Sequence, residues 1–581
     1  MGTIFSSPSL LPSQNFRNGN HISLTRSLHS DKSSLSTSSS WRRHHFFHYC
    51  SSTATALNSI RGGSIDGASS DGDDGTTSST QTQYNSSPKN LNILSLPHSI
   101  RERNDDVHAA LLAVVAACRV TRSLQPDGTL FGNDNNNIND NINNNNITTL
   151  SKQDDSPVTI GDFASQAVAL QILNTFFPQD VYLAEEGSEA LRAEERLLDK
   201  VWEAVHGVCD GSWVLGRRDR GGKDAVWGGK EGLLEAIDFG RGLGGISNDG
   251  TKTKPRRVWA LDPIDGTKGF LRGRLSGGQY CVALALIEDG VPMLSVLGCP
   301  NLPTKHNHNS GHDNASNSNA NGKAPYGAWT EEEAQESEKA KMKSTSTTIG
   351  SKKQIFLGNR GCLFLAVRGC GCYEIPLHLL ERYILDEDST SDSASDCHGN
   401  NNPPWTRLYV TPNNSDETIT TNINSDTNTK ESPSQATFCL GVERSFSDPK
   451  GTILQIAKRI HGPDGVVTGE DGIPDIVNSL RMDGQVKYGL LARGEAQYFL
   501  RLPKEGYVDW IWDVAAGYGV LMEAGGRMTD VLGEEINFSE IGVEGKAKLP
   551  ESVRGIFGSC GGGVFHDALV DAYSEVEGGR R

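Results

Sequence analysis

One nine-residue segment, Trp259-Ala-Leu-Asp262-Pro263-Ile264-Asp265-Gly266-Thr267, constrains this chain more than any other part of its sequence. Two acidic residues three positions apart follow an apolar run that is typical of a buried strand. Pro263 fixes its own backbone and keeps Asp262 extended, so both carboxylates can converge where the strand ends. Gly266 allows a sharp turn, after which the next amides can begin a helix that favours phosphate. The segment predicts Mg²⁺ ligands beside an anion site, although an acidic turn with capping aspartates would have the same composition.

Three further sites with acidic residues could join this pair. Glu185-Glu186 end an apolar, strand-like run, although adjacent acids are also typical of a solvated loop. Asp513 follows Trp510-Ile-Trp512 and stands where a helix N-cap is expected, before a helix that closes at Gly525-Gly526. Asp162 follows Ser-Pro-Val-Thr at the start of another predicted helix and could also be a cap. Taken singly, each position has an ordinary structural explanation.

Helix and strand patterns alternate along the ordered part of the chain. Apolar residues recur at helical spacing over 108–124 and from Asp162 to Pro178, where proline ends the helix. Strand patterns cover 258–261, 279–288, 291–297 and 355–368, with Asp289-Gly290 as a hairpin turn. This mixture predicts an α/β (α+β layered) protein in which helices and sheets form alternating layers.

Low-complexity segments divide the 581 residues into parts. Residues 1–97 are predicted to be a disordered leader, 98–300 an N-terminal α+β metal-binding subdomain, and 352–575 a C-terminal α/β subdomain. The polar stretch 301–351 is predicted to be an insertion between them, and 386–434 an insertion within the second.

The first 60 residues carry five basic side chains against one acid and are rich in Ser, His and Asn. This composition is typical of a transit peptide for a plastid or mitochondrion. The alternative is a plain disordered tail on a cytoplasmic protein.

The overall charge limits the partners of the chain. A net charge of −17 makes it a poor general partner for nucleic acid or for an anionic membrane. No apolar run reaches the roughly 18 residues that a membrane span requires.

The 11 cysteines show no paired metal-binding pattern and favour a reducing compartment. We expect a monomer.

In their order along the chain, these motifs resemble the inositol monophosphatase superfamily. The matching elements are Asp162 after Ser-Pro-Val-Thr, Glu185-Glu186, Asp-Pro-Ile-Asp-Gly-Thr, and Trp512-Asp513 before a helix ending Glu-Ala-Gly-Gly. Three further runs are similar to the 3′(2′),5′-bisphosphate nucleotidases: Lys268-Gly-Phe-Leu-Arg272, Gln485-Val-Lys487-Tyr and Tyr498-Phe-Leu-Arg501-Leu-Pro. The resemblance implies alternating helix and sheet layers of the inositol monophosphatase / fructose-1,6-bisphosphatase type.

The resemblance also implies an activity and its residues. The expected reaction is Mg²⁺-dependent, Li⁺-sensitive removal of the 3′-phosphate from a small phosphorylated nucleotide, adenosine 3′,5′-bisphosphate, with its sulfated relative as a second candidate substrate. Two or three Mg²⁺ ions would be held by Glu185, Asp262, Asp265, Asp513 and the backbone carbonyl of Ile264. Asp162 and Thr267 would be the water-activating pair, with Asp162 as general base. Substrate contacts would come from Gly266, Thr267, Lys487, Arg501 and Asp513.

Two positions depart from the nucleotidase pattern. Phe446 stands where a polar residue or histidine is common, and Gly484 where serine is common, which leaves the nucleotide preference open. One alternative is an inositol polyphosphate 1-phosphatase, and another is a catalytically weak nucleotide-binding sensor. A complete acidic set with its water-activating pair favours an enzyme over the sensor.

Overall fold

The computed structural model describes twelve parts of the chain. These are residue 100 and the ranges 103–126, 149–151, 157–208, 227–242, 255–304, 360–385, 405–410, 432–442, 450–468, 473–560 and 563–579. The predicted leader, most of the two predicted insertions, and Phe446 lie outside the described residues.

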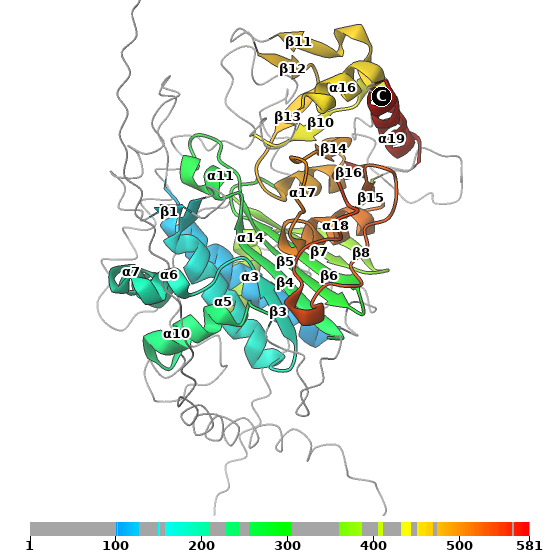
Figure 1. Cartoon of the computed structure of the whole chain (residues 1–581). Helices are drawn as coiled ribbons and strands as arrows, with labels where there is room; N and C mark the ends of the chain where they lie inside the picture. Colours follow the sequence, from blue (N-terminus) through cyan, green and yellow to red (C-terminus); the bar gives the residue numbers. More distant parts are fainter. Residues whose placement is uncertain are drawn as a thin grey trace, which may run out of the picture. The chain divides into compact units, whose positions relative to one another are not determined.

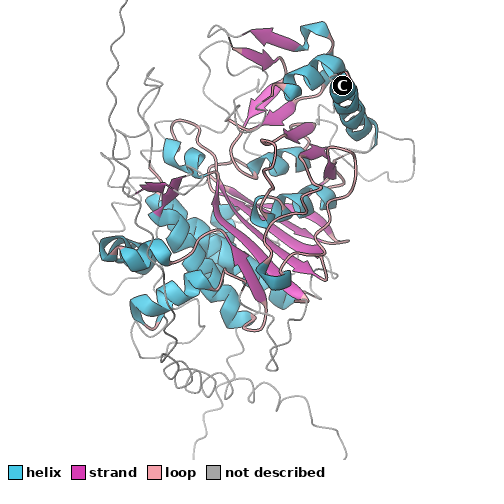
Figure 2. Cartoon of the chain, in the orientation of Figure 1, coloured by secondary structure: helices cyan, strands magenta, loops and turns pink. Residues whose placement is uncertain are grey.

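A seven-stranded sheet organises the first part of the fold (Figures 1 and 2). Its order is β3-β4-β5-β6-β7-β8-β9, with β3 parallel to β4 and every other neighbouring pair antiparallel. The strands are β3 (Val181–Ala184), β4 (Arg257–Asp265), β5 (Cys281–Glu288), β6 (Val291–Cys299), β7 (Cys362–Val367), β8 (Gly371–Pro376) and β9 (Thr406–Leu408). The central strands are buried on both faces, which explains their nearly continuous apolar sequences. Asp289 and Gly290 turn β5 into β6 with positive φ angles of 51° and 85°, as the Asp-Gly pair predicted.

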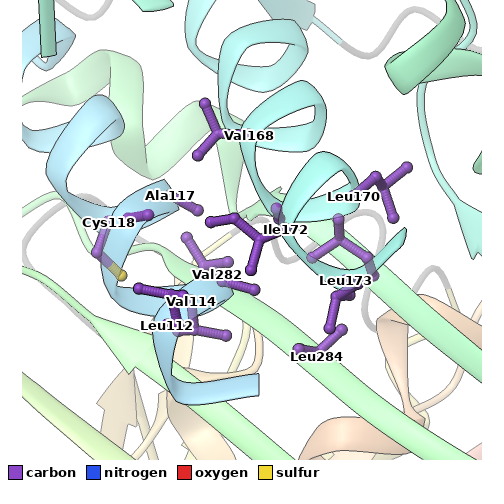
Figure 3. Close-up of a cluster of buried hydrophobic side chains, with 14 of the residues drawn as sticks. Leu112, Val114, Ala117, Cys118, Val168, Leu170, Ile172, Leu173, Val282 and Leu284 are labelled. Carbon is purple, nitrogen blue, oxygen red and sulfur yellow. The ribbon is translucent and has the colours of Figure 1, made fainter. Parts of the chain in front are cut away.

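Two long helices cover one face of this sheet. α3 (Asn104–Leu124) and α5 (Ile160–Phe176) pack against each other and against the sheet (Figure 3). Val282 and Leu284 of β5 point into this helical layer, whereas the alternate residue Ala283 belongs to the core on the opposite face. The smaller helices here are α6 (Glu189–Ala193), α7 (Glu195–Val208), α10 (Gly229–Asp238) and α14 (Leu377–Leu385), beside the short strands β1 (Thr149–Ser151) and β2 (Pro157–Thr159).

The opposite face of the sheet carries a second helical layer and then a second sheet. α17 (Val486–Ala492) and α18 (Ala515–Glu523) pack between the seven-stranded sheet and a five-stranded sheet of order β13-β10-β14-β16-β15. The second sheet contains β10 (Phe438–Leu440), β13 (Ser479–Arg481), β14 (Tyr498–Arg501), β15 (Arg527–Asp530) and β16 (Ile556–Ser559), and its outer face is covered by α16 (Thr452–His461) and α19 (Gly563–Gly578). Short elements complete it: η2 (Pro433–Gln435), η3 (Pro463–Gly465), β11 (Val466–Thr468), β12 (Pro474–Ile476) and η5 (Val543–Gly545). The layers therefore alternate α, β, α, β, α, which confirms the expected fold class.

The predicted subdomain division needs correction. Strands β7, β8 and β9 follow the segment 301–351 but pair into the same sheet as β3 to β6. That segment therefore connects two strands of one sheet, and the change of sheet comes between β9 and β10. The predicted insertion 386–434 also contains an ordered element, because the edge strand β9 pairs with β8 there.

Helix α3 corrects the expectation about membrane-spanning sequences. In the described part of the chain, α3 alone has the length and apolar composition of a membrane span. Of its most apolar 18-residue window, 78% is buried inside the fold, against α5 and the sheet. Its apolar composition is accounted for by its position as a core helix.

Candidate metal and phosphate site

Three elements bring the predicted acidic residues together. Ala184 at the end of β3 lies opposite Leu261 of the parallel strand β4, so Glu185 and Asp262 follow at the same edge of the sheet. The pairing of β4 with β5 shifts register between Asp262 and Asp265, which places two carboxylates at this irregular strand end. Asp513 ends η4 (Ile511–Asp513), a short 3-10 helix that contacts β4 and β5.

The charges of these carboxylates act on one another. Burial, together with Glu185, Asp265 and Asp513, raises the pKa of Asp262 well above its usual value. Burial also raises the pKa of Asp513 to about 8, against the opposing charge of Arg501. Clustered buried carboxylates that disfavour one another's ionisation are suited to a hard cation with oxygen ligands, so the residues fit Mg²⁺.

Several of the same oxygens have protein partners. Asp262 Oδ1 accepts a hydrogen bond from the Ile264 amide at 3.0 Å, and Asp265 Oδ2 accepts one from the Gln485 amide at 2.8 Å. The carbonyl of Ile264 accepts from Thr267 Oγ1 at 3.2 Å. Within the described ranges, no three acidic, histidine or cysteine side chains form a ready metal cage. The hydrogen bonds given above orient the proposed ligand oxygens.

Gly266 begins the next helix, as predicted. It adopts the left-handed conformation with φ 99° at the N-terminal boundary of α11 (Thr267–Arg272). A β-carbon at this position would lie 3.1 Å from the carbonyl oxygen of Gln279. The sharp turn therefore requires glycine both for its dihedral angle and for the close approach of the backbone.

Asp162 combines a capping contact with a position beside Thr267. It is the third residue of α5, and its Oδ2 accepts from the Thr159 amide at 2.8 Å, while the Thr159 side chain accepts from the backbone of the helix, so the two residues form a capping box. The same Oδ2 also accepts from the Thr159 hydroxyl at 2.7 Å. Its Oδ1 lies 3.5 Å from Thr267 Oγ1. The Asp162 carboxylate is 1% exposed. The capping contact orients it toward Thr267, its predicted partner.

The Glu185-Glu186 pair does not lie in a solvated loop. Glu186 is buried, and its backbone amide and carbonyl both bond to the side chain of Gln166 on α5, at 2.9 Å and 2.6 Å. The same Gln166 amide also donates to Ile237 at 3.0 Å. Gln166 thereby fixes the chain beside half-buried Glu185, although no motif in the sequence singled it out.

A loop from the second half of the chain closes over Asp265. Gly484 has φ 55°, and a β-carbon there would lie 2.3 Å from the Asp265 carbonyl oxygen, so the departure from serine has a steric reason. Lys487 Nζ donates to the carbonyl of Gly484 at 2.5 Å and to that of Met482 at 3.3 Å. The positive charge of Lys487 works against the rise that burial causes in the pKa of Asp265.

The Lys268-Gly-Phe-Leu-Arg272 run docks against this loop. Arg272 forms an ion pair with Asp483, the residue before Gly484. Gly269 leaves room for the contact, because a β-carbon there would lie 2.6 Å from Asp483 Oδ2 and 2.0 Å from the Gln279 carbonyl. The run therefore joins α11 to the segment that carries Lys487.

Asp513 is not a helix cap, which corrects that interpretation. The N-cap of α18 is Val514, with no side-chain cap. The Asp513 carboxylate instead lies 3.2 Å from Arg501 Nη2. Arg501 ends β14 and makes a shorter contact, 2.7 Å, with Asp509, a buried carboxylate outside the predicted set.

Gln485 also contributes more than its sequence suggested. Besides the amide that binds Asp265, its side chain donates to the Trp512 carbonyl at 2.7 Å and accepts from the Gly517 amide at 2.8 Å. It thus connects the loop over Asp265 to the segment around Asp513. Gln485 belongs to the Gln485-Val-Lys487-Tyr run, but the residues that its side chain contacts lie 27 and 32 positions away in the sequence.

Comparison with known proteins shows the family of this chain. Residues 134–360 and 398–570 match the inositol monophosphatase family, and the chain belongs to that family. A relative from Emericella nidulans named 3′(2′),5′-bisphosphate nucleotidase is 32% identical over 397 residues, covering 68% of this chain and 82% of the relative. A protein of the same name from Schizosaccharomyces pombe is 31% identical over 390 residues, covering 67% of this chain and 78% of that protein.

Among solved structures, the extragenic suppressor protein suhB from Bartonella henselae aligns with a TM-score of 0.37 and 14% identity, covering 82% of this chain and 99% of that chain. The family match and the two named relatives confirm the resemblance that was drawn from the order of the motifs.

Proposed function

We propose that this protein is a Mg²⁺-dependent 3′(2′),5′-bisphosphate nucleotidase that converts adenosine 3′,5′-bisphosphate to AMP and phosphate. One observation carries the proposal: the charges of Glu185, Asp262, Asp265 and Asp513, which come from neighbouring strand ends and η4, act on one another, and those of Lys487 and Arg501 act on Asp265. Carboxylates of this density suit Mg²⁺, and the two cations suit a substrate with two phosphate groups. The names of the relatives support the choice of substrate.

The proposed ligands are the four carboxylates with the carbonyl of Ile264, for two or three Mg²⁺ ions. When bound, Mg²⁺ supplies positive charge that stabilises the phosphoryl group and makes water a better acid. In this proposal Thr267 orients the attacking water and Asp162 accepts its proton, and the 3.5 Å separation of their oxygens supports the pairing. Water oxygen attacks phosphorus, the bond from phosphorus to the 3′ oxygen breaks, and the leaving oxygen takes a proton from solvent while Asp162 returns its proton to solvent.

Lys487 and Arg501 are the proposed contacts to the second phosphate group, with Gly266 and Thr267 beside the reacting one. Lys487 is held by two backbone carbonyls, and Arg501 by two carboxylates, so both cations have defined positions before the substrate arrives. Groups that are positioned in advance lose less conformational freedom on binding.

A substrate panel tests the proposal. Phosphate release should be fastest with adenosine 3′,5′-bisphosphate, should occur with its sulfated relative, and should stop after chelation and return with Mg²⁺. Lys487→Ala and Arg501→Ala should mainly raise KM, because they remove binding rather than chemistry. Preferential hydrolysis of an inositol bisphosphate would show an inositol polyphosphate 1-phosphatase instead. Nucleotide binding without turnover would show a sensor.

A further inference from the structure

Arg501 contacts Asp509, a residue that the sequence did not predict to be part of the site. A single nitrogen, Arg501 Nη2, lies 2.7 Å from Asp509 Oδ1 and 3.2 Å from Asp513 Oδ2. One of these carboxylates belongs to the candidate metal site and the other does not. The guanidinium group therefore lies between two competing anions, closer to Asp509.

Asp509 is held in place independently of Arg501. Its carbonyl accepts from the Leu549 amide at 3.0 Å, and two residues later the Ile511 amide bonds to the Ala547 carbonyl at 2.8 Å. Trp510 forms a β-bridge with Lys548 between these two contacts. The backbone thus fixes the carboxylate from the far side, so it can act as an anchor for a more mobile side chain.

Asp509 is only 1% exposed, yet few favourable contacts offset the cost of burying its charge. Neither of its oxygens accepts a hydrogen bond of regular geometry from the described residues, and Arg501 is the ion-pair partner. Burying a charge in this way contributes little net stability, since its desolvation opposes the attraction. A role in stability alone therefore explains the pair poorly.

The competition with Asp513 supplies a better explanation. Among the ion pairs of Arg501 in the described residues, removal of Asp509 would leave the one with the candidate Mg²⁺ ligand Asp513, whose Oδ2 already accepts a hydrogen bond from Arg501 Nη2 at 3.2 Å. Pairing there would draw Arg501 away from the substrate and compete with the cation for the same oxygens. The ring of Tyr507, with its centroid 5.9 Å from Arg501 Cζ, limits the movement of the guanidinium group on another side.

We propose that Asp509 is a positioning residue that holds Arg501 toward the substrate and limits its pairing with Asp513. The proposal rests on the proposed function, because it assumes that Arg501 binds a phosphate group. Asp509 acts only through Arg501, so its effect must disappear when Arg501 is absent.

A double-mutant cycle on the full chain tests this directly. Asp509→Asn should raise KM for adenosine 3′,5′-bisphosphate about tenfold and change kcat less than about twofold, whereas the same change in an Arg501→Ala background should alter KM less than about twofold. Asp509→Glu should restore part of the affinity. Equal effects of Asp509→Asn in both backgrounds, or an unchanged KM, would overturn the proposal.

A second measurement needs no substrate. Asp509→Asn should raise the Mg²⁺ concentration at which the metal-induced shift in melting temperature is half complete, because the freed Arg501 competes for Asp513. Asp530→Asn is the matched control: Asp530 is another buried aspartate, 6% exposed, which accepts the Leu532 and Glu534 amides at 2.8 Å and 2.9 Å. It should lower the melting temperature without moving the Mg²⁺ midpoint or KM, and an equal midpoint shift in both variants would reduce Asp509 to a structural residue.

The proposed function can be wrong while the proposed role of Asp509 is right, and a separate measurement distinguishes the two. If the wild-type protein released no phosphate from the bisphosphate, the cycle would be run with inorganic phosphate and Mg²⁺ by calorimetry. Coupling between Asp509 and Arg501 in the phosphate Kd would then support the positioning role alone, and its absence would contradict it.

Discussion

At the scale of single residues, Asp265 joins the two halves of the site. Its Oδ2 accepts the Gln485 amide at 2.8 Å, while Lys487 and Arg501 act on its charge. Asp265→Asn keeps the shape of the side chain but removes the charge of a proposed metal ligand. Turnover should fall by about 100-fold or more, since even indirect changes to a metal site cost roughly 10–100-fold. Comparison of kcat, with circular dichroism as the folding control, checks this, and an unchanged kcat in a folded variant would remove Asp265 from the metal site.

Gly484 gives a steric prediction. A side chain there would be strained at φ 55° and would place its β-carbon 2.3 Å from the Asp265 carbonyl oxygen. Gly484→Ser should therefore displace the loop over Asp265 and lower kcat/KM, although serine is common at this position in the nucleotidase pattern. Steady-state kinetics with Gly494→Ser as control suit the test, because Gly494 also has a positive φ of 75° but no atom within 4 Å of its β-carbon position. Equal losses in both variants would show that backbone strain alone is responsible.

At the scale of elements, the contact between α11 and the loop at Asp483 should be cooperative. Arg272→Gln and Asp483→Asn each break the same ion pair, whose side chains are 28% and 9% exposed. We expect each to lower the unfolding free energy by about 1 kcal/mol and the double variant to lose little more, because residues in contact are not additive. Urea unfolding of the four proteins measures the coupling. Fully additive losses would show that the two residues act separately.

A buried histidine on a helix that covers the second sheet should make stability depend on pH. His566 of α19 is fully buried between Thr529 Oγ1 at 2.8 Å and Ser559 Oγ at 3.0 Å, and burial, with the charge of Arg527, lowers its pKa to about 4. Between that value and about 6.5 the unfolded chain binds the extra proton. Stability contributed by the neutral ring is therefore complete above about pH 6.5 and falls by up to about 1.4 kcal/mol per pH unit as the pH drops toward 4.

Urea unfolding at several pH values checks this dependence. His566→Gln should flatten the stability profile between pH 4 and 6.5, even if it lowers stability overall. The variant and the wild type losing stability in parallel over that window would assign the effect to other groups.

The elements differ in how well local sequence predicted them. Strands β5 and β6 are buried on both faces, so their apolar runs and the Asp289-Gly290 turn were sufficient. Helix α5 was predicted from Asp162 and ends at Phe176, just before Pro178. Strand β9 was missed because three residues inside a polar stretch carry no periodic signal, and it forms only by pairing with β8.

Local sequence likewise predicted some residues of the candidate site and missed others. Asp262 and Asp265 share one motif, so their proximity follows from local geometry alone. Gln166 and Asp509 could not be found from the sequence, because their contacts depend on which loops meet after the layers have packed. The capping interpretation of Asp513 failed for the same reason: its carboxylate pairs with Arg501, which lies on another element.

At the scale of the whole molecule, the composition of the first 60 residues gives a test of location. They contain five basic residues and one acidic residue, and we propose that they direct the protein to a plastid or mitochondrion. A fluorescent protein fused after residue 90 should leave the cytosol, and one fused to residues 98–581 should remain there. Cytosolic fluorescence from the first fusion would make the segment a plain extension and the enzyme cytoplasmic.

The distribution of the site along the chain has a consequence for synthesis and refolding. Glu185 and Asp513 are separated by most of the fold, and they meet only after β3, β4 and η4 have packed. Contacts of such long range form late, because loop closure precedes them. A nascent chain cannot complete the site until Asp513 has emerged from the ribosome. No partly synthesised form should therefore consume substrate. In a refolding experiment, recovery of phosphatase activity should lag behind recovery of helical circular dichroism, which would make turnover a stringent measure of the fully assembled native state.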